Sequence, residues 1–120
     1  MAQINAAVDA LVGDWLFLPD VAARLSIPVG RVKQLLRDRK LLAVMRPDGT
    51  LAVPAAFIDG PQIVKGLQGT LTLLRDCGFD EVEALHWLFT EDDTLPGTPI
   101  EAICRRRGTE VNRRAQALAF

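Results

Sequence analysis

Several features that define other classes of protein are scarce or missing in this chain of 120 residues. Its two cysteines, Cys77 and Cys104, stand far apart and form no Cys-x-x-Cys pair, so neither metal-ligand spacing nor a disulfide framework is present. No apolar run approaches the roughly 20 residues that cross a bilayer. An export signal begins with basic residues, and this chain has no Lys or Arg before Arg24. These absences predict a cytoplasmic protein with reduced thiols and no contact with membranes.

Groups suited to catalysis are equally scarce. The single histidine, His86, lies within an apolar stretch, and no Ser or Cys stands beside it as a nucleophile. We expect a core or interface histidine there. Glu91, Asp92 and Asp93 lack the alternating ligands and glycine of a calcium loop. We therefore expect a non-enzymatic protein with no catalytic residue, no metal site and no cofactor.

What the chain does contain is a pair of short helical patterns that meet at a corner. Two helices of this length share one small core only when they cross steeply, as in a helix-turn-helix. Ser26 and Ile27 form the corner, with Ile27 filling it. The apolar positions of the two patterns are Val21, Ala22 and Leu25, then Val32, Leu35 and Leu36.

Positive charge accumulates around the second of these helices. Between Arg24 and Arg46 there is one acid, Asp38, whereas an ordinary solvated helix face mixes both signs. We interpret this stretch as a DNA-reading surface; the alternative is a solvated face. The residues expected in the DNA groove are Arg31, Lys33, Gln34 and Arg37, and those expected on phosphate are Arg39, Lys40 and Arg46.

A hairpin is predicted next, with strands over 42–45 and 50–53. Between them, Arg46-Pro47-Asp48-Gly49 has the residues of a tight turn. Such a hairpin after a helix-turn-helix is a wing, and we expect Arg46 near its tip.

The remaining charge is segregated. The net charge of −1 argues against a protein that coats DNA by bulk electrostatics. From Asp76 to Glu101 the chain has eight acids and no Lys or Arg. This acidic region fits a surface that faces away from DNA, a surface for a basic protein partner, or a solvated face.

Four further helices, and a leading one, follow from apolar periodicity and capping residues. We expect the leading helix over Ile4 to Trp15, with Trp15 in the core. In the next helix, over 62–76, Gly66 and Gly69 indicate close packing, and Gly78 ends it. The last three are expected over 80–89, 99–107 and 110–119, the first two beginning with the capping pairs Asp80/Glu83 and Thr98/Glu101. The arginines between 105 and 114 form a second phosphate patch only if the fold brings them beside Arg37.

Four segments together resemble a small actinobacterial family of winged helix-turn-helix DNA-binding proteins known from mycobacteria. They are Leu18-Pro19-Asp20-Val21-Ala22, the helix from Arg31 to Arg39, Trp87-Leu88, and Gly108 to Ala119. The resemblance implies a cytoplasmic, regulator-like protein that binds DNA, with the helix around Arg31 to Arg37 as recognition element. Ser26 replaces the usual turn glycine and Pro28 the usual capping Ser or Thr, which indicates a turn wider than standard.

A weaker resemblance covers the C-terminal third alone. Trp87-Leu88, the segment from Leu95 to Glu101 and Val111 are similar to the toxin-binding domain of one class of antitoxins. The sequence thus predicts a mainly α-helical winged helix-turn-helix with a short β-hairpin wing and a helical C-terminal extension. We expect a DNA-binding region over 1–58 and a helical region over 59–120 packed on it. The expected function is duplex DNA binding and transcription regulation, with an antitoxin-like module that binds a protein through its C-terminal helices as the alternative.

Overall fold

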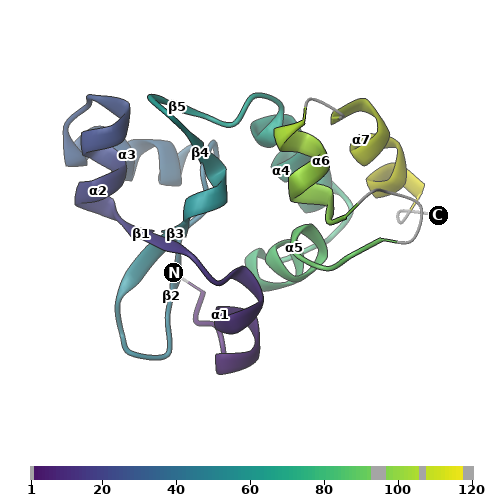
Figure 1. Ribbon diagram of the computed structural model, residues 1–120, viewed down its shortest axis with the longest axis horizontal. Helices are drawn as coiled ribbons and strands as arrows, with labels where there is room; N and C mark the ends of the chain where they lie inside the picture. Colours follow the sequence, from purple (N-terminus) through teal and green to yellow (C-terminus); the bar gives the residue numbers. More distant parts are fainter. Residues whose placement is uncertain (1, 93–96, 106–107, 118–120) are drawn as a thin grey trace.

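A computed structural model describes residues 2–92, 97–105 and 108–117, without the side chains of 108–110. In Figure 1 the helices α2 and α3 lie at one end of the molecule and α4, α6 and α7 at the other. The helices and short strands lie at α1 (Ala6–Val12), β1 (Trp15–Phe17), α2 (Leu18–Leu25), α3 (Val29–Arg37), β2 (Val44–Met45), β3 (Leu51–Pro54), η1 (Ala55–Phe57), β4 (Ile58–Asp59), β5 (Gln62–Ile63), α4 (Leu67–Asp76), α5 (Glu81–Leu88), α6 (Pro99–Cys104) and α7 (Gly108–Ala117).

The first half is a winged helix-turn-helix, as predicted. Its antiparallel sheet has the strand order β1-β3-β2, so the hairpin of β2 and β3 is extended by the strand that precedes α2. Between α2 and α3 the turn comprises three residues, within the normal range for this motif. The expectation of a wider turn is wrong, because Ser26 itself adopts the left-handed conformation (φ 57°) that glycine usually supplies. The N–H of Ile27 then donates to the carbonyl of Ala22, 3.0 Å away.

The second half is helical apart from one two-stranded ribbon. The strands β4 and β5 form an antiparallel pair that leads into α4, and α4 packs against both α5 and α7. The α5 start is a full capping box: Asp80 accepts from the Glu83 N–H at 2.7 Å, and Glu83 accepts from the Asp80 N–H. As expected, Thr98 caps α6 and Gly78, at φ 91°, follows the end of α4.

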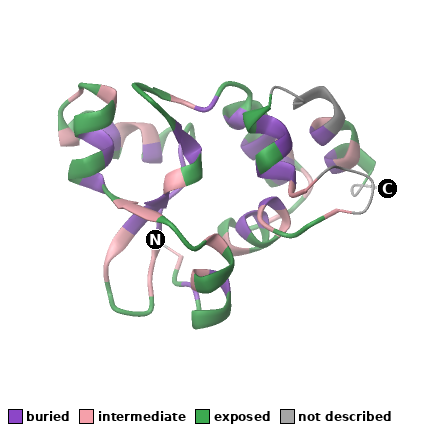
Figure 2. Ribbon diagram, in the orientation of Figure 1, coloured by how far each residue is buried: buried purple, intermediate pink, exposed green. Residues whose placement is uncertain are grey.

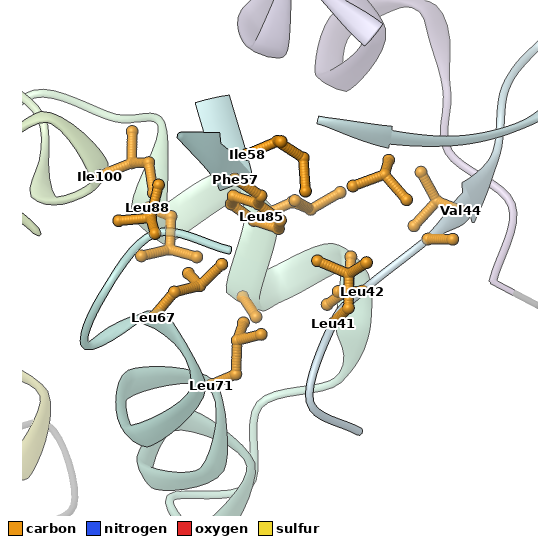
Figure 3. Close-up of a cluster of buried hydrophobic side chains, with 14 of the residues drawn as sticks. Leu41, Leu42, Val44, Phe57, Ile58, Leu67, Leu71, Leu85, Leu88 and Ile100 are labelled. Atoms are coloured by element: carbon orange, nitrogen blue, oxygen red, sulfur yellow. The ribbon is translucent and has the colours of Figure 1, made fainter. Parts of the chain in front are cut away.

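One buried cluster joins the two halves. It includes Leu41, Leu42 and Val44 after α3, and Leu85 and Leu88 of α5 (Figure 3). Contacts between α1 and α5 add a second connection. In Figure 2, buried residues gather where the elements meet, whereas the connecting loops are largely exposed. The C-terminal half is therefore packed against the winged half through a shared core.

Four expected elements differ from the structure. The helix expected over 99–107 ends at Cys104. Trp15 is not the end of a core helix: α1 ends at Val12, and Trp15 is a half-buried strand residue paired with Pro54. The helix expected from residue 62 begins at Leu67, because Gln62–Ile63 pairs with β4 instead. The first hairpin strand, expected from residue 42, begins at Val44.

Of the two glycines expected to mark close packing, neither approaches another element tightly. A Cβ on Gly66 would lie 3.9 Å from Ile103, an ordinary contact, and a Cβ on Gly69 would meet nothing within 4 Å. The conformation of Gly66 (φ 92°), at the N-terminal cap of α4, explains that glycine instead.

Candidate nucleic-acid interface

Helix α3 is held against α2 by its apolar side, which determines what it presents outward. Val32 has no exposed surface and Leu36 is buried, facing Val21 and Ala22 of α2 in the shared core. Since residues three and four apart share a helix face, Leu35 packs beside Val32 and Leu36, whereas Lys33 and Gln34 turn away from this contact. The sequence predicted this division.

Five basic residues of α3 and the segment that follows are exposed. They are Arg31, Lys33, Arg37, Arg39 and Lys40. No ion pair forms on any of these five among the residues that the structure describes. Their positive charge is therefore not offset by a direct ion pair within the described chain. A polyanion brought to this face would supply that opposite charge.

The side chain of Gln34 is engaged within the helix. Its Oε1 accepts from Nη2 of Arg37 at 2.8 Å, and its Nε2 donates to Oδ1 of Asp38 at 2.9 Å. The single acid of the basic stretch is thus bonded to an amide. All three groups lie at the surface, where such bonds exchange readily with other partners.

The backbone turns sharply at Arg39. Its φ of 59° is left-handed, which places the residue just beyond the last turn of α3, and the next N–H, that of Lys40, donates to the carbonyl of Leu35 at 2.9 Å. The chain then enters the buried segment at Leu41. Arg39 and Lys40 are therefore fixed at the exposed end of the recognition helix.

Arg46, expected near the tip of the wing with its side chain on phosphate, is turned back toward α1. Its Nε lies 2.8 Å from Oδ1 of Asp9, and its guanidinium carbon lies 5.6 Å from the ring centroid of Trp15. The hydrogen bond that Arg46 donates to Asp9 is the main reason that the pKa of Arg46 is raised. Arg46 also sits at the base of the turn, where its N–H donates to Thr50. It joins the wing to α1 and β1.

The turn of the wing carries an acid. Asp48 Oδ1 accepts from the Thr50 hydroxyl and from the Thr50 N–H, at 2.6 and 3.0 Å. These bonds, the hydroxyl first, lower the pKa of Asp48, so it is ionised at neutral pH. With Arg46 paired to Asp9, the exposed turn of Pro47, Asp48 and Gly49 offers no basic side chain.

The C-terminal arginines do not extend the α3 surface. Figure 1 shows α7 at the opposite end of the molecule from α3. Arg105 pairs with Glu101 at 4.0 Å, and Arg113 is exposed on α7. Residues 106 and 107 of the expected patch lie outside the described residues. The condition that would make these arginines a second phosphate patch, proximity to Arg37, is not met.

Helix α5 uses its apolar side inside the chain. Leu85 and Leu88 have no exposed surface, and α5 contacts α1, α4 and α6. This packing accounts for the apolar residues of α5 within the chain itself. Of the two expectations for His86, a core or an interface histidine, its exposure excludes the core and leaves the interface as a prediction. Among the described helices, none combines the length and apolar character needed to cross a membrane.

Among the contacts of this region that the sequence pattern did not indicate is the pair of Asp9 and Arg46. The two residues are 37 positions apart and belong to different elements. A charge pattern along the chain signals neighbours on one helix and not a contact of this range. The proximity follows only once β1 is known to pair with β3, which brings Trp15 under the wing.

Comparisons with known proteins match two family models to the chain. Residues 3–58 match the family described as "DNA-binding protein Rv2175c, wHTH domain", and residues 64–119 match the "Rv2175c C-terminal domain of unknown function". The DNA-binding protein Rv2175c of Mycobacterium tuberculosis is 39% identical over 115 residues, which cover 86% of this chain and 79% of that protein. An NMR structure of Rv2175c superposes with a TM-score of 0.84 at 34% identity, covering 100% of this chain and 89% of the other.

Proposed function

This chain belongs to the family of the mycobacterial DNA-binding protein Rv2175c, and on that premise we propose that it binds duplex DNA with α3 in the major groove. The observation that carries the proposal is the set of five exposed cations on and after α3, none of which pairs with an acid of the described chain. Because the net charge of the whole chain is −1, attraction to DNA has to come from this local concentration of cations and not from the overall charge. Salt-dependent phosphate binding follows from it.

The residues of α3 divide into two roles by their position. In helix-turn-helix proteins the N-terminal part of the second helix contacts base edges. Arg31 and Lys33 occupy that part of α3, with Gln34 and Arg37 one turn further along. We assign base reading to Arg31 and Gln34, since Arg matches guanine and Gln matches adenine bidentately. To do so Gln34 exchanges its bonds with Arg37 and Asp38 for bonds to the base.

Two features of α3 favour a close approach of its N-terminus to DNA. Gly30 has open space around the position of a Cβ, so the backbone lies bare there. No side chain caps the helix, whose N-terminal cap is Pro28, and the first N–H groups remain available to a phosphate oxygen. Arg39 and Lys40 are assigned to phosphate at the other end of the helix.

Arg46 receives a different role from the one expected. Its pairing with Asp9 supports a positioning residue that fixes the wing against α1, rather than a phosphate contact.

The function that these assignments support is site-specific DNA binding in the cytoplasm that regulates transcription, without catalysis. Residues 1–58 carry the DNA contacts, and residues 59–120 pack on them.

The test is selection of bound sites from a random duplex library, followed by affinity measurements on the selected site and on random duplex. Arg31→Ala and Gln34→Ala should each lose roughly 5- to 150-fold on the selected site, the equivalent of about 1 to 3 kcal/mol, and keep random binding. Arg113→Ala is the matched control and should change neither. Equal losses on all sequences would contradict base reading and make the protein an architectural binder.

A further inference from the structure

A groove of about 470 Å³ lies along the seam between the two halves of the molecule. Leu36 reaches it from α3, Leu41 and Leu42 from the segment after α3, Leu71 from α4 and Ala84 from α5. Three of these leucines, at 41, 42 and 71, belong to the cluster drawn in Figure 3. A hollow of this size with mostly apolar walls, placed where two halves meet, has the form of a small-molecule site.

Two arginines line the same groove from different elements. Arg39 comes from the end of α3 and Arg75 from the last turn of α4, and neither forms an ion pair with any residue that the structure describes. Both are exposed. Two guanidinium groups beside an apolar floor suit a ligand with an anionic head and an apolar body.

Two acids also line the groove, and both sit at the start of α5. Asp80 is the N-terminal cap and accepts from the Glu83 N–H at 2.7 Å, while Glu81 lies in the first helical turn. The positive end of the helix dipole offsets acids at these positions. The formal charges of the groove therefore balance, but the two acids are partly offset by the start of α5, whereas the two arginines form no ion pair among the described residues.

We propose that this groove binds an amphipathic carboxylate, with its head on Arg39 and Arg75 and its apolar body on the leucines of the floor. Guanidinium and carboxylate match in shape and form paired hydrogen bonds, which fixes the head. The apolar body is held by burial against Leu36, Leu71 and their neighbours. A straight acyl chain and a compact aromatic body both satisfy this chemistry.

Occupancy of the groove opposes DNA binding, and this second step rests on the function proposed above. Arg39 is shared, because the same guanidinium that binds the carboxylate is assigned to a DNA phosphate. A ligand that takes Arg39 weakens DNA binding, and by linkage DNA weakens the ligand by the same factor. Arg75 belongs to the groove alone, which allows the two steps to be separated.

The first experiment titrates the full chain, without DNA, with decanoate, decanol or decylammonium below the concentrations at which they form micelles, followed by amide NMR. Decanoate should bind saturably and shift the amides around Leu36, Arg75 and Ala84. Arg75→Ala should weaken it about tenfold or more, as the loss of a charged hydrogen bond does, with Arg75→Lys intermediate. Arg113→Ala, an exposed cation on α7 outside the groove, should change nothing.

Three results would overturn the proposal. Decylammonium could bind as well as decanoate, or the amide shifts could be centred on another surface. The third such result is that the Arg75→Ala protein binds decanoate unchanged. A titration with benzoate and naphthoate distinguishes an aromatic body from an acyl chain.

The second experiment measures duplex affinity with and without decanoate. Decanoate should weaken DNA binding of the unaltered protein, whereas Arg75→Ala should bind DNA normally and lose the response. Decanoate binding without any effect on DNA would overturn the coupling and leave the site. A protein that binds decanoate but no duplex would instead contradict the DNA-binding function.

Discussion

Removal of one cation from the α3 surface should change the salt dependence of DNA binding by a fixed amount. The structure offers five exposed basic residues on and after α3, and each phosphate that is neutralised contributes about 0.9 to the log–log slope. With Arg31 assigned to base reading, the other four give a slope of about −3.6, so affinity should fall about 150-fold between 50 and 200 mM salt. Lys40→Ala should reduce the slope to about −2.7 and the fall to about 40-fold.

The structure separates Lys40 from Arg46 in this assay. Arg46 is paired with Asp9 at 2.8 Å and contributes no free charge to the wing, so Arg46→Ala should leave the slope near its original value. Arg113→Ala, at the far end of the molecule, is the control for loss of one positive charge. Fluorescence anisotropy of a labelled duplex at four or more salt concentrations gives all the slopes. A flattened slope for Arg46→Ala with an unchanged one for Lys40→Ala would refute the assignment of phosphate contacts.

Three further results are expected. Gly66→Ala should lower the free energy of unfolding by about 1 to 2 kcal/mol, because residue 66 has a left-handed backbone. Gly69→Ala lies in open space within α4 and should raise the free energy of unfolding by up to about 1 kcal/mol. Denaturant titration of the two variants tests both expectations. Asp9→Asn and Arg46→Met should each lower the melting temperature, and the double variant should fall no further than either, since both remove one interaction. Burial raises the pKa of Cys104. In a Cys77→Ser protein, the rate at which Cys104 is alkylated should therefore rise at a higher pH in the folded chain than in the unfolded chain. A pH midpoint of alkylation in the folded chain at or below that of the unfolded chain would contradict this.

The elements that could be predicted from the sequence are those with local causes. The corner between α2 and α3 follows from apolar spacing over a few residues, and the α5 start follows from Asp80 and Glu83 three positions apart. The exposed cations of α3 follow from the same helical period, because burial of Val32 and Leu36 fixes which side remains for solvent.

The parts that escaped prediction depend on contacts between distant residues. Trp15 fits a helical period with Val8 and Leu11, yet pairing with Pro54 draws it into a strand. Ile63 likewise has the spacing of the apolar residues of α4, but it pairs with Ile58 in the ribbon of β4 and β5. The chain then turns at Gly66, whose φ is positive, before α4 begins. The contact of Arg46 with Asp9 could not be predicted for the same reason, because Asp9 is close only after β1 has joined the sheet.

The central claim, that α3 and the residues after it form the DNA-binding surface, is tested most directly by amide NMR of the isotope-labelled protein during titration with a selected duplex. We expect the largest shift changes between Val29 and Lys40, with weaker ones in the turn of the wing and none on α7. Changes centred on the C-terminal helices, or no change at low salt with any duplex, would contradict it.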